Sequence, residues 1–171
     1  MSIGGVSNSN IGDNNYKIFE ELLKEKRIIL HVYSHTSYLL TTLQNNKNLI
    51  IHDYVTNHSD LIKEISKYDF GISLSLPSPD NFIQAKMASG VRIYDYLTAG
   101  LPIIIDAKHT SVANIITTNN FGLVIPLNEI RNITTYINRS NYELLLISVK
   151  KNRNNFIAET HKGEVLKFLN E

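Results

Sequence analysis

The sequence predicts an α/β domain with a Rossmann-like fold: a doubly wound parallel sheet of about six strands, followed by a helical C-terminal tail. Two observations carry this prediction. Short apolar runs without polar alternation recur along the chain, as expected for strands that helices cover on both faces. Between these runs lie segments with apolar residues at helical spacing, so strands and helices alternate and favour right-handed crossovers.

Each element can be assigned in order along the 171 residues. The expected strands are residues 2–6, 27–33, 49–54, 70–76, 102–106 and 122–125. The helices expected between them are residues 16–25, 37–45, 59–67, 92–99 and 111–118. Beyond Leu127 the pattern predicts helices alone, over residues 130–137, 141–156 and 162–169. No repeat or linker divides the chain, so residues 1–171 are expected to form a single domain.

Composition excludes several classes of function. The hydrophobic content is 43%, the charged content is 19% and the net charge is +1, which gives no basis for binding nucleic acid. The chain has no cysteine, so disulfides and cysteine-ligated zinc are excluded. No signal peptide or transmembrane run is recognisable, which predicts a cytoplasmic location, at most with contact to the inner face of a membrane.

The most informative segment is residues 92–105, a short helix that runs into a buried strand. Gly100 suits the left-handed position after a helix, and Pro102 prevents the helix from continuing. Arg92 and Asp95 are three residues apart, so both project from one face near the helix N-terminus. From spacing alone they form either a surface ion pair or part of an anion site at the positive end of the helix.

This segment resembles the signature of GT-B glycosyltransferases, whose donor half contains Lys-x-x-Glu-Tyr-Leu-Ala-x-Gly-x-Pro before an apolar strand. Arg92 and Asp95 replace the basic and acidic residues of that signature, and its other matches are Tyr96, Leu97, Gly100 and Pro102. The order of elements along nearly the whole chain is similar as well. The resemblance implies that Asp95 accepts hydrogen bonds from a nucleotide ribose and that Arg92 is the catalytic residue beside the diphosphate.

The same resemblance implies further contacts with the donor. These would come from the glycine turn after the first strand, from the loops after the later strands and from the start of the expected helix at residue 111. The residues concerned are Gly4, Gly5, Tyr54, Val55, Ser89, Gly90, Thr110 and Ser111. Purely structural roles remain possible for two pairs of these residues. Tyr54 and Val55 can end a buried strand, and Thr110 or Ser111 can cap the helix.

The resulting hypothesis is the donor-binding domain of a glycosyltransferase that uses a nucleoside-diphosphate sugar, in the synthesis of a surface polysaccharide or glycan. No cofactor and no metal are expected, because the histidines are scattered and Asp-x-Asp is absent. The acceptor-binding N-terminal domain would be missing, so this domain alone is expected to be inactive. Any peripheral membrane contact would be made by that missing half.

Two alternatives remain. A sugar-nucleotide epimerase-like domain shares the architecture, but it would need carboxylates in the cleft. A non-catalytic nucleotide-sugar-binding or adaptor domain is favoured by two departures from the family pattern. Met87 stands where many members carry a sugar-binding glutamate, and residues 1–16 contain neither Arg nor Lys.

Overall fold

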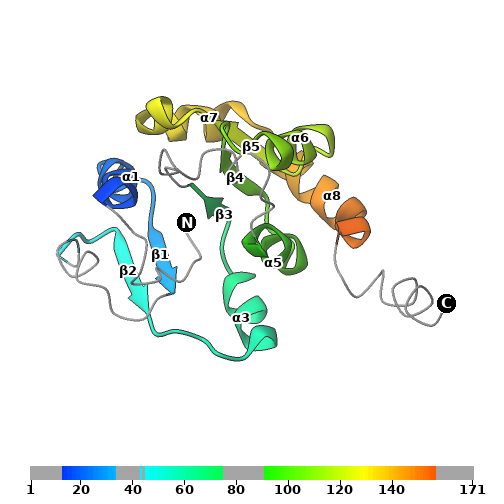
Figure 1. Cartoon of the computed structure of the whole chain (residues 1–171), viewed down its shortest axis with the longest axis horizontal. Helices are drawn as coiled ribbons and strands as arrows, with labels where there is room; N and C mark the ends of the chain where they lie inside the picture. Colours follow the sequence, from blue (N-terminus) through cyan, green and yellow to red (C-terminus); the bar gives the residue numbers. More distant parts are fainter. Residues whose placement is uncertain (1–12, 34–42, 44, 75–90, 157–171) are drawn as a thin grey trace.

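The computed structural model describes residues 13–33, 43, 45–74 and 91–156. Its elements alternate between strand and helix and end in helices alone (Figure 1). In order they are α1 (Asp13–Leu23), β1 (Leu30–Tyr33), β2 (Leu49–His52), α3 (His58–Ile65), β3 (Gly71–Ser73), α5 (Val91–Ala99), β4 (Ile103–Asp106), α6 (Thr110–Thr118), β5 (Gly122–Ile125), η2 (Leu127–Asn132), α7 (Ile133–Arg139), α8 (Tyr142–Asn152) and η3 (Arg153–Phe156).

The strands form two parallel sheets. In the first, β1 pairs with β2, and Leu30 lies opposite Leu49. In the second, β4 lies between β3 and β5, and Ile104 lies opposite Ile72 on one side and Leu123 on the other. The predicted α/β class with parallel strands is confirmed. The expected sheet of about six strands is seen, within the described residues, as five strands in sheets of two and three.

Several element boundaries differ from the sequence prediction. The ladder of β1 and β2 covers four residues of each strand, so residues 27–29 and 53–54 are not in strands. Helix α3 begins at His58 because the side chain of Asn57 accepts a hydrogen bond from the backbone N–H of Asp60. The tail is helical as predicted, but 3₁₀ turns (η2 and η3) precede α7 and follow α8. The expected elements 2–6 and 162–169 lie outside the described residues, as do residues 37–42 and 44 of the helix expected at 37–45.

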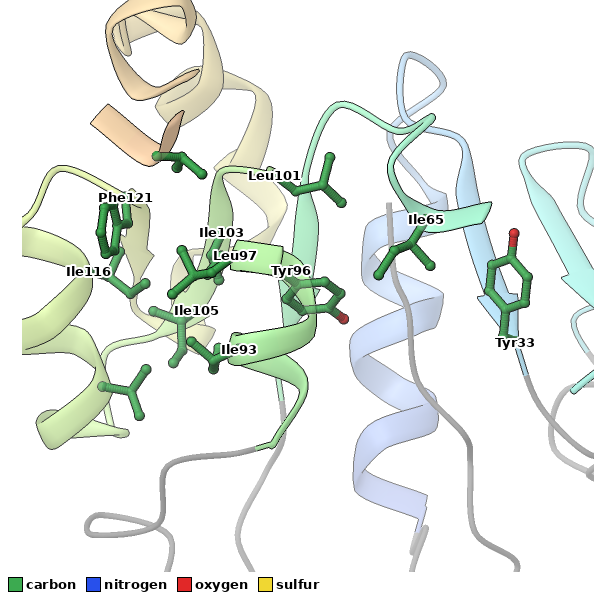
Figure 2. Packing of buried hydrophobic residues seen from close by; sticks show 12 residues of the cluster. Tyr33, Ile65, Ile93, Tyr96, Leu97, Leu101, Ile103, Ile105, Ile116 and Phe121 are labelled. Carbon is green, nitrogen blue, oxygen red and sulfur yellow. The ribbon is translucent and has the colours of Figure 1, made fainter. Parts of the chain in front are cut away.

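Helices cover both faces of the three-stranded sheet (Figure 1). Alternate side chains of β4 point to opposite sides, so Ile103 and Ile105 join one apolar cluster and Ile104 joins another. The first cluster, part of which Figure 2 shows, contains residues of α3, α5 and α6. The second contains residues of α1, η2 and α7. Among the described helices none is long and apolar enough to cross a membrane.

Helix α5 is fixed to β3 by Tyr96. Its side chain is fully buried, and its hydroxyl donates a 2.8 Å hydrogen bond to the carbonyl oxygen of Ile72. The ring lies so close to Gly71 that a Cβ at that position would be 2.2 Å from Tyr96 Cγ. The close approach of α5 to the sheet therefore requires glycine at position 71.

Asp106, at the carboxyl end of β4, is a fully buried acidic residue. Neither of its carboxyl oxygens has a hydrogen-bond partner of good geometry within the described part of the chain. Burial raises the pKa of the Asp106 carboxyl, and this effect outweighs the nearby backbone N–H groups of Lys108 and Leu127 and the charges of His109 and Lys108. The carboxylate form of Asp106 is thus disfavoured in the folded protein.

The substitution Gly71→Ala is expected to destabilise the fold by about 3 kcal/mol, the upper end of the usual range for overpacking. The added methyl group would meet the ring of Tyr96, which cannot move away without breaking its buried hydrogen bond. Urea unfolding measures the effect. Ser73→Ala, two residues along the same strand, is the control and should change stability by about 0.5 kcal/mol or less. Equal stabilities for the two variants would contradict the close approach of α5.

The substitution Asp106→Asn is expected to change how stability depends on pH. Because the folded pKa of Asp106 is raised above its ordinary value of 3.8, its favourable contribution is present below that value and is lost as the pH rises through the folded pKa. Asparagine does not titrate, so the stability of the wild type relative to Asp106→Asn should fall as the pH increases. Urea unfolding between about pH 4 and about pH 8 measures this difference. Asp60→Asn, at an exposed position, is the control, and a pH-independent difference for Asp106→Asn would contradict the burial argument.

Candidate functional site

The candidate site lies at the carboxyl ends of the strands, where helices α3, α5 and α6 begin. Helix α3 follows β2 and helix α6 follows β4, while α5 ends where the chain enters β4. All three N-termini therefore face the same edge, which is where open parallel sheets bind ligands. Backbone N–H groups and the positive ends of helix dipoles converge there, a favourable setting for an anion.

The loop between β2 and α3 contributes Tyr54 and Val55. Strand β2 ends at His52, so the alternative in which Tyr54 ends a buried strand is wrong. The side chain of Tyr54 is 47% exposed, whereas Val55 is partly buried and packs against the apolar cluster of α5. Val55 thus fastens the loop to the core and leaves the aromatic ring beside it accessible.

A cluster of aromatic rings lies at the ends of β1 and β2, directly before this loop. The ring of Tyr33 stacks on that of His52, with centroids 4.5 Å apart, and the Tyr33 and Tyr68 hydroxyls are 2.6 Å apart. His31 Nδ1 lies 2.8 Å from His52 Nε2. Burial, and then the neighbouring His52, lower the pKa of the His31 imidazole, so the neutral form of His31 is favoured. Ring stacking and hydrogen bonds in this cluster therefore fix the residues from which the β2–α3 loop starts.

The acidic residue of the predicted motif, Asp95, is bound to a histidine. Asp95 Oδ1 lies 2.8 Å from His58 Nε2, which links the first residue of α3 to α5. The alternative of an Arg92–Asp95 surface pair does not account for this contact of Asp95 with His58. Sequence reasoning did not single out His58, because the two residues are 37 positions apart and only the packing of α3 against α5 brings them together.

The basic residue and the start of α6 complete the edge. Arg92 is the second residue of α5 and is exposed. Thr110 and Ser111 are the first two residues of α6 and are also exposed. The expectation that either one caps this helix is wrong, because the N-cap position is His109, whose side chain makes no capping hydrogen bond. Thr110 and Ser111 belong instead to the first helical turn, where backbone N–H groups lack an intrahelical acceptor.

Two of the predicted site residues have contacts that link α5 to the start of α3. Asp95 contacts His58, the first residue of α3, and Val55, in the loop before α3, packs against the apolar cluster that contains residues of α5. Four other predicted residues, Gly4, Gly5, Ser89 and Gly90, lie outside the described part of the chain. Within the described ranges, no three His, Asp or Glu side chains gather in a way that would hold a metal ion.

Two solved structures show the same fold at low sequence identity. The crystal structure of TarM matches 99% of this chain with a TM-score of 0.60 and 14% identity, and the apo structure of OtsA matches 93% with a TM-score of 0.54 and 13% identity. The matched parts are 34% of the TarM chain and 42% of the OtsA chain, so this chain spans less than half the length of either protein.

The family comparison covers most of the chain. Residues 10–167 match the model of the glucosyltransferase 3-like, C-terminal domain. No curated protein sequence matches the chain. The family match and the structural likenesses agree with the resemblance that the Arg92–Pro102 segment carries. The chain belongs to the glucosyltransferase 3-like, C-terminal domain family.

Proposed function

We propose that this domain binds the nucleoside-diphosphate part of a sugar donor at the carboxyl edge of its strands and serves as the donor-binding half of a glycosyltransferase. The observation that carries the proposal is the position of Asp95. Its carboxylate contacts His58, the first residue of α3, and the loop before α3 carries the exposed Tyr54, so base, ribose and phosphate contacts are available along one edge.

In this proposal each residue has a role suited to its chemistry. Asp95 accepts a hydrogen bond from a ribose hydroxyl, and Tyr54 and Val55 contact the base. Arg92 and the first-turn amides of α6, at Thr110 and Ser111, face the diphosphate. Gly4, Gly5, Ser89 and Gly90 are further donor contacts that we propose from the sequence motif.

The chemistry requires stabilisation of a leaving diphosphate. Arg92 and the backbone N–H groups at the helix N-termini supply positive potential where negative charge develops, without a bound metal. These donors are positioned by helices that pack on the sheet, so little reorganisation is needed during the reaction. Arg92 is therefore the residue to which we assign stabilisation of the leaving group.

We further propose how the domain acts within a longer enzyme. A second domain, N-terminal to this one, would bind the acceptor and close the cleft over the donor, so the domain alone would bind donor weakly and transfer little sugar. The product would be a surface polysaccharide or glycan, made in the cytoplasm, with any membrane contact made through the second domain. The family match supports the transferase over the epimerase-like alternative.

The predicted first strand, residues 2–6, would complete the sheet. Within the described residues β1 pairs with β2 alone and β3 with β4 alone, so each has an edge without a partner strand. A cavity of about 610 Å³ is lined both by residues that precede β1, such as Ile28, and by residues that precede β3, such as Phe70. A strand between β1 and β3 would join the two sheets, and it would carry Gly4 and Gly5 to the same edge as Asp95.

This placement predicts contacts between backbone protons of residues 2–6 and both Val32 of β1 and Ile72 of β3 in nuclear Overhauser spectra. The amides of residues 3–5 should also exchange slowly with solvent, because they would be hydrogen-bonded within a sheet. Contacts between Val32 and Ile51, which are paired in the structure, are the positive control. Contacts to neither strand, together with rapid amide exchange, would contradict the six-stranded sheet.

Nucleotide binding can be measured on the chain directly by titration with uridine and guanosine diphosphate. We expect one of them, at millimolar concentration, to shift the backbone amide resonances of residues 54–56, 91–95 and 110–112. The amides of α7, on the other face, are the internal control. The corresponding nucleoside without phosphate should still shift residues 54–56 and should leave residues 110–112 unchanged. If neither diphosphate shifts these resonances, the proposed function is wrong.

A further inference from the structure

His58 contacts the carboxylate of Asp95, the group to which the proposed function assigns the binding of a ribose hydroxyl. It is the first residue of α3, and its Nε2 lies 2.8 Å from Asp95 Oδ1 on the neighbouring helix α5. The side chain of Asp95 is 18% exposed, whereas that of His58 is 63% exposed. The imidazole is therefore much more exposed than the carboxylate that it contacts.

The two oxygens of Asp95 have different surroundings. Oδ1 is held by His58, while Oδ2 accepts no hydrogen bond from the described residues. The side chain of Asp95 keeps part of its surface exposed, in contrast to both buried oxygens of Asp106. A carboxylate with one oxygen fixed and the other reachable can accept one additional hydrogen bond in a defined direction.

The elements on either side make this arrangement rigid. Asn57 caps α3 and so fixes the position from which His58 extends. Tyr96, the residue after Asp95, anchors α5 to β3 through its buried hydrogen bond. Both partners of the pair thus start from backbone that is already fixed, and the hydrogen bond restricts the remaining rotation of the Asp95 carboxylate.

We propose that His58 is a positioning residue for ribose recognition: it fixes Oδ1 of Asp95 so that Oδ2 points toward a hydroxyl of the nucleotide ribose. This inference rests on the proposed function. An isolated exposed ion pair contributes little to stability. Here the value of the pair lies in binding, because the carboxylate does not have to be ordered when the nucleotide arrives.

The test compares the affinities of a nucleoside diphosphate and its 2′,3′-dideoxy analogue by calorimetry, using uridine and guanosine diphosphate as probes. The wild type should bind the ribonucleotide more tightly than the analogue. In His58→Ala the affinity for the ribonucleotide should fall about 2- to 10-fold, the cost of ordering one freed side chain. The affinity for the analogue should be unchanged, because it lacks the hydroxyls that Asp95 would contact.

Three further variants separate positioning from general damage to the fold. His58→Gln places an amide N–H near the position of Nε2 and should restore most of the preference for ribose. Asp60→Asn, on the exposed face of the same helix, should leave both affinities unchanged. In an Asp95→Asn background, His58→Ala should have little additional effect on the ribonucleotide, because both changes remove one interaction.

The outcomes distinguish this inference from the proposed function. If the wild type binds neither diphosphate, the proposed function and the inference are both wrong. If the wild type binds and prefers ribose, and His58→Ala keeps that preference, the role of His58 alone is wrong. Equal losses for the ribonucleotide and its analogue in both His58→Ala and His58→Gln would also overturn it, since they would indicate a purely structural contact.

Discussion

The contact of the Tyr96 ring with Gly71 is the constraint on which the arrangement of the candidate site depends. It brings α5 so close to β3 that no side chain fits at position 71, and the hydrogen bond from the Tyr96 hydroxyl to the Ile72 carbonyl fixes the rotation of the helix. Arg92 and Asp95 lie on the same short helix, within one turn of Tyr96. Their positions at the edge of the sheet are therefore set by packing in the core, not by contacts at the surface.

The polar groups at this edge depend on the same core. Val55 packs against the apolar cluster that contains α5, and the rings at the ends of β1 and β2 support the loop in front of it. Helix α3 then begins at a capped position and places His58 on Asp95. Apolar packing at Val55, ring stacking before the loop and the cap of α3 together give this short loop a defined geometry.

Asp106 differs from Asp95 in being fully enclosed by the packing of the core. Its carboxyl group is enclosed at the end of the central strand of the three-stranded sheet, between the turns that lead to α6 and to η2. Burial raises its pKa, whereas the carboxylate of Asp95 stays in reach of solvent and of a histidine. Two aspartates at the same edge of the fold thus differ in exposure: the side chain of Asp95 is partly exposed and that of Asp106 is fully buried.

The sequence by itself determined the class of fold, the parallel strands, the helical tail and the motif from Arg92 to Pro102, because apolar periodicity and glycine and proline positions are local signals. The sequence could not set the strand lengths, because a strand extends only as far as it pairs with its neighbour. Nor could it give the start of α6, where His109 takes the N-cap position. The tertiary structure alone decided that Asp95 pairs with His58 of α3. That pair joins residues 37 positions apart, and only the packing of α3 against α5 brings them together.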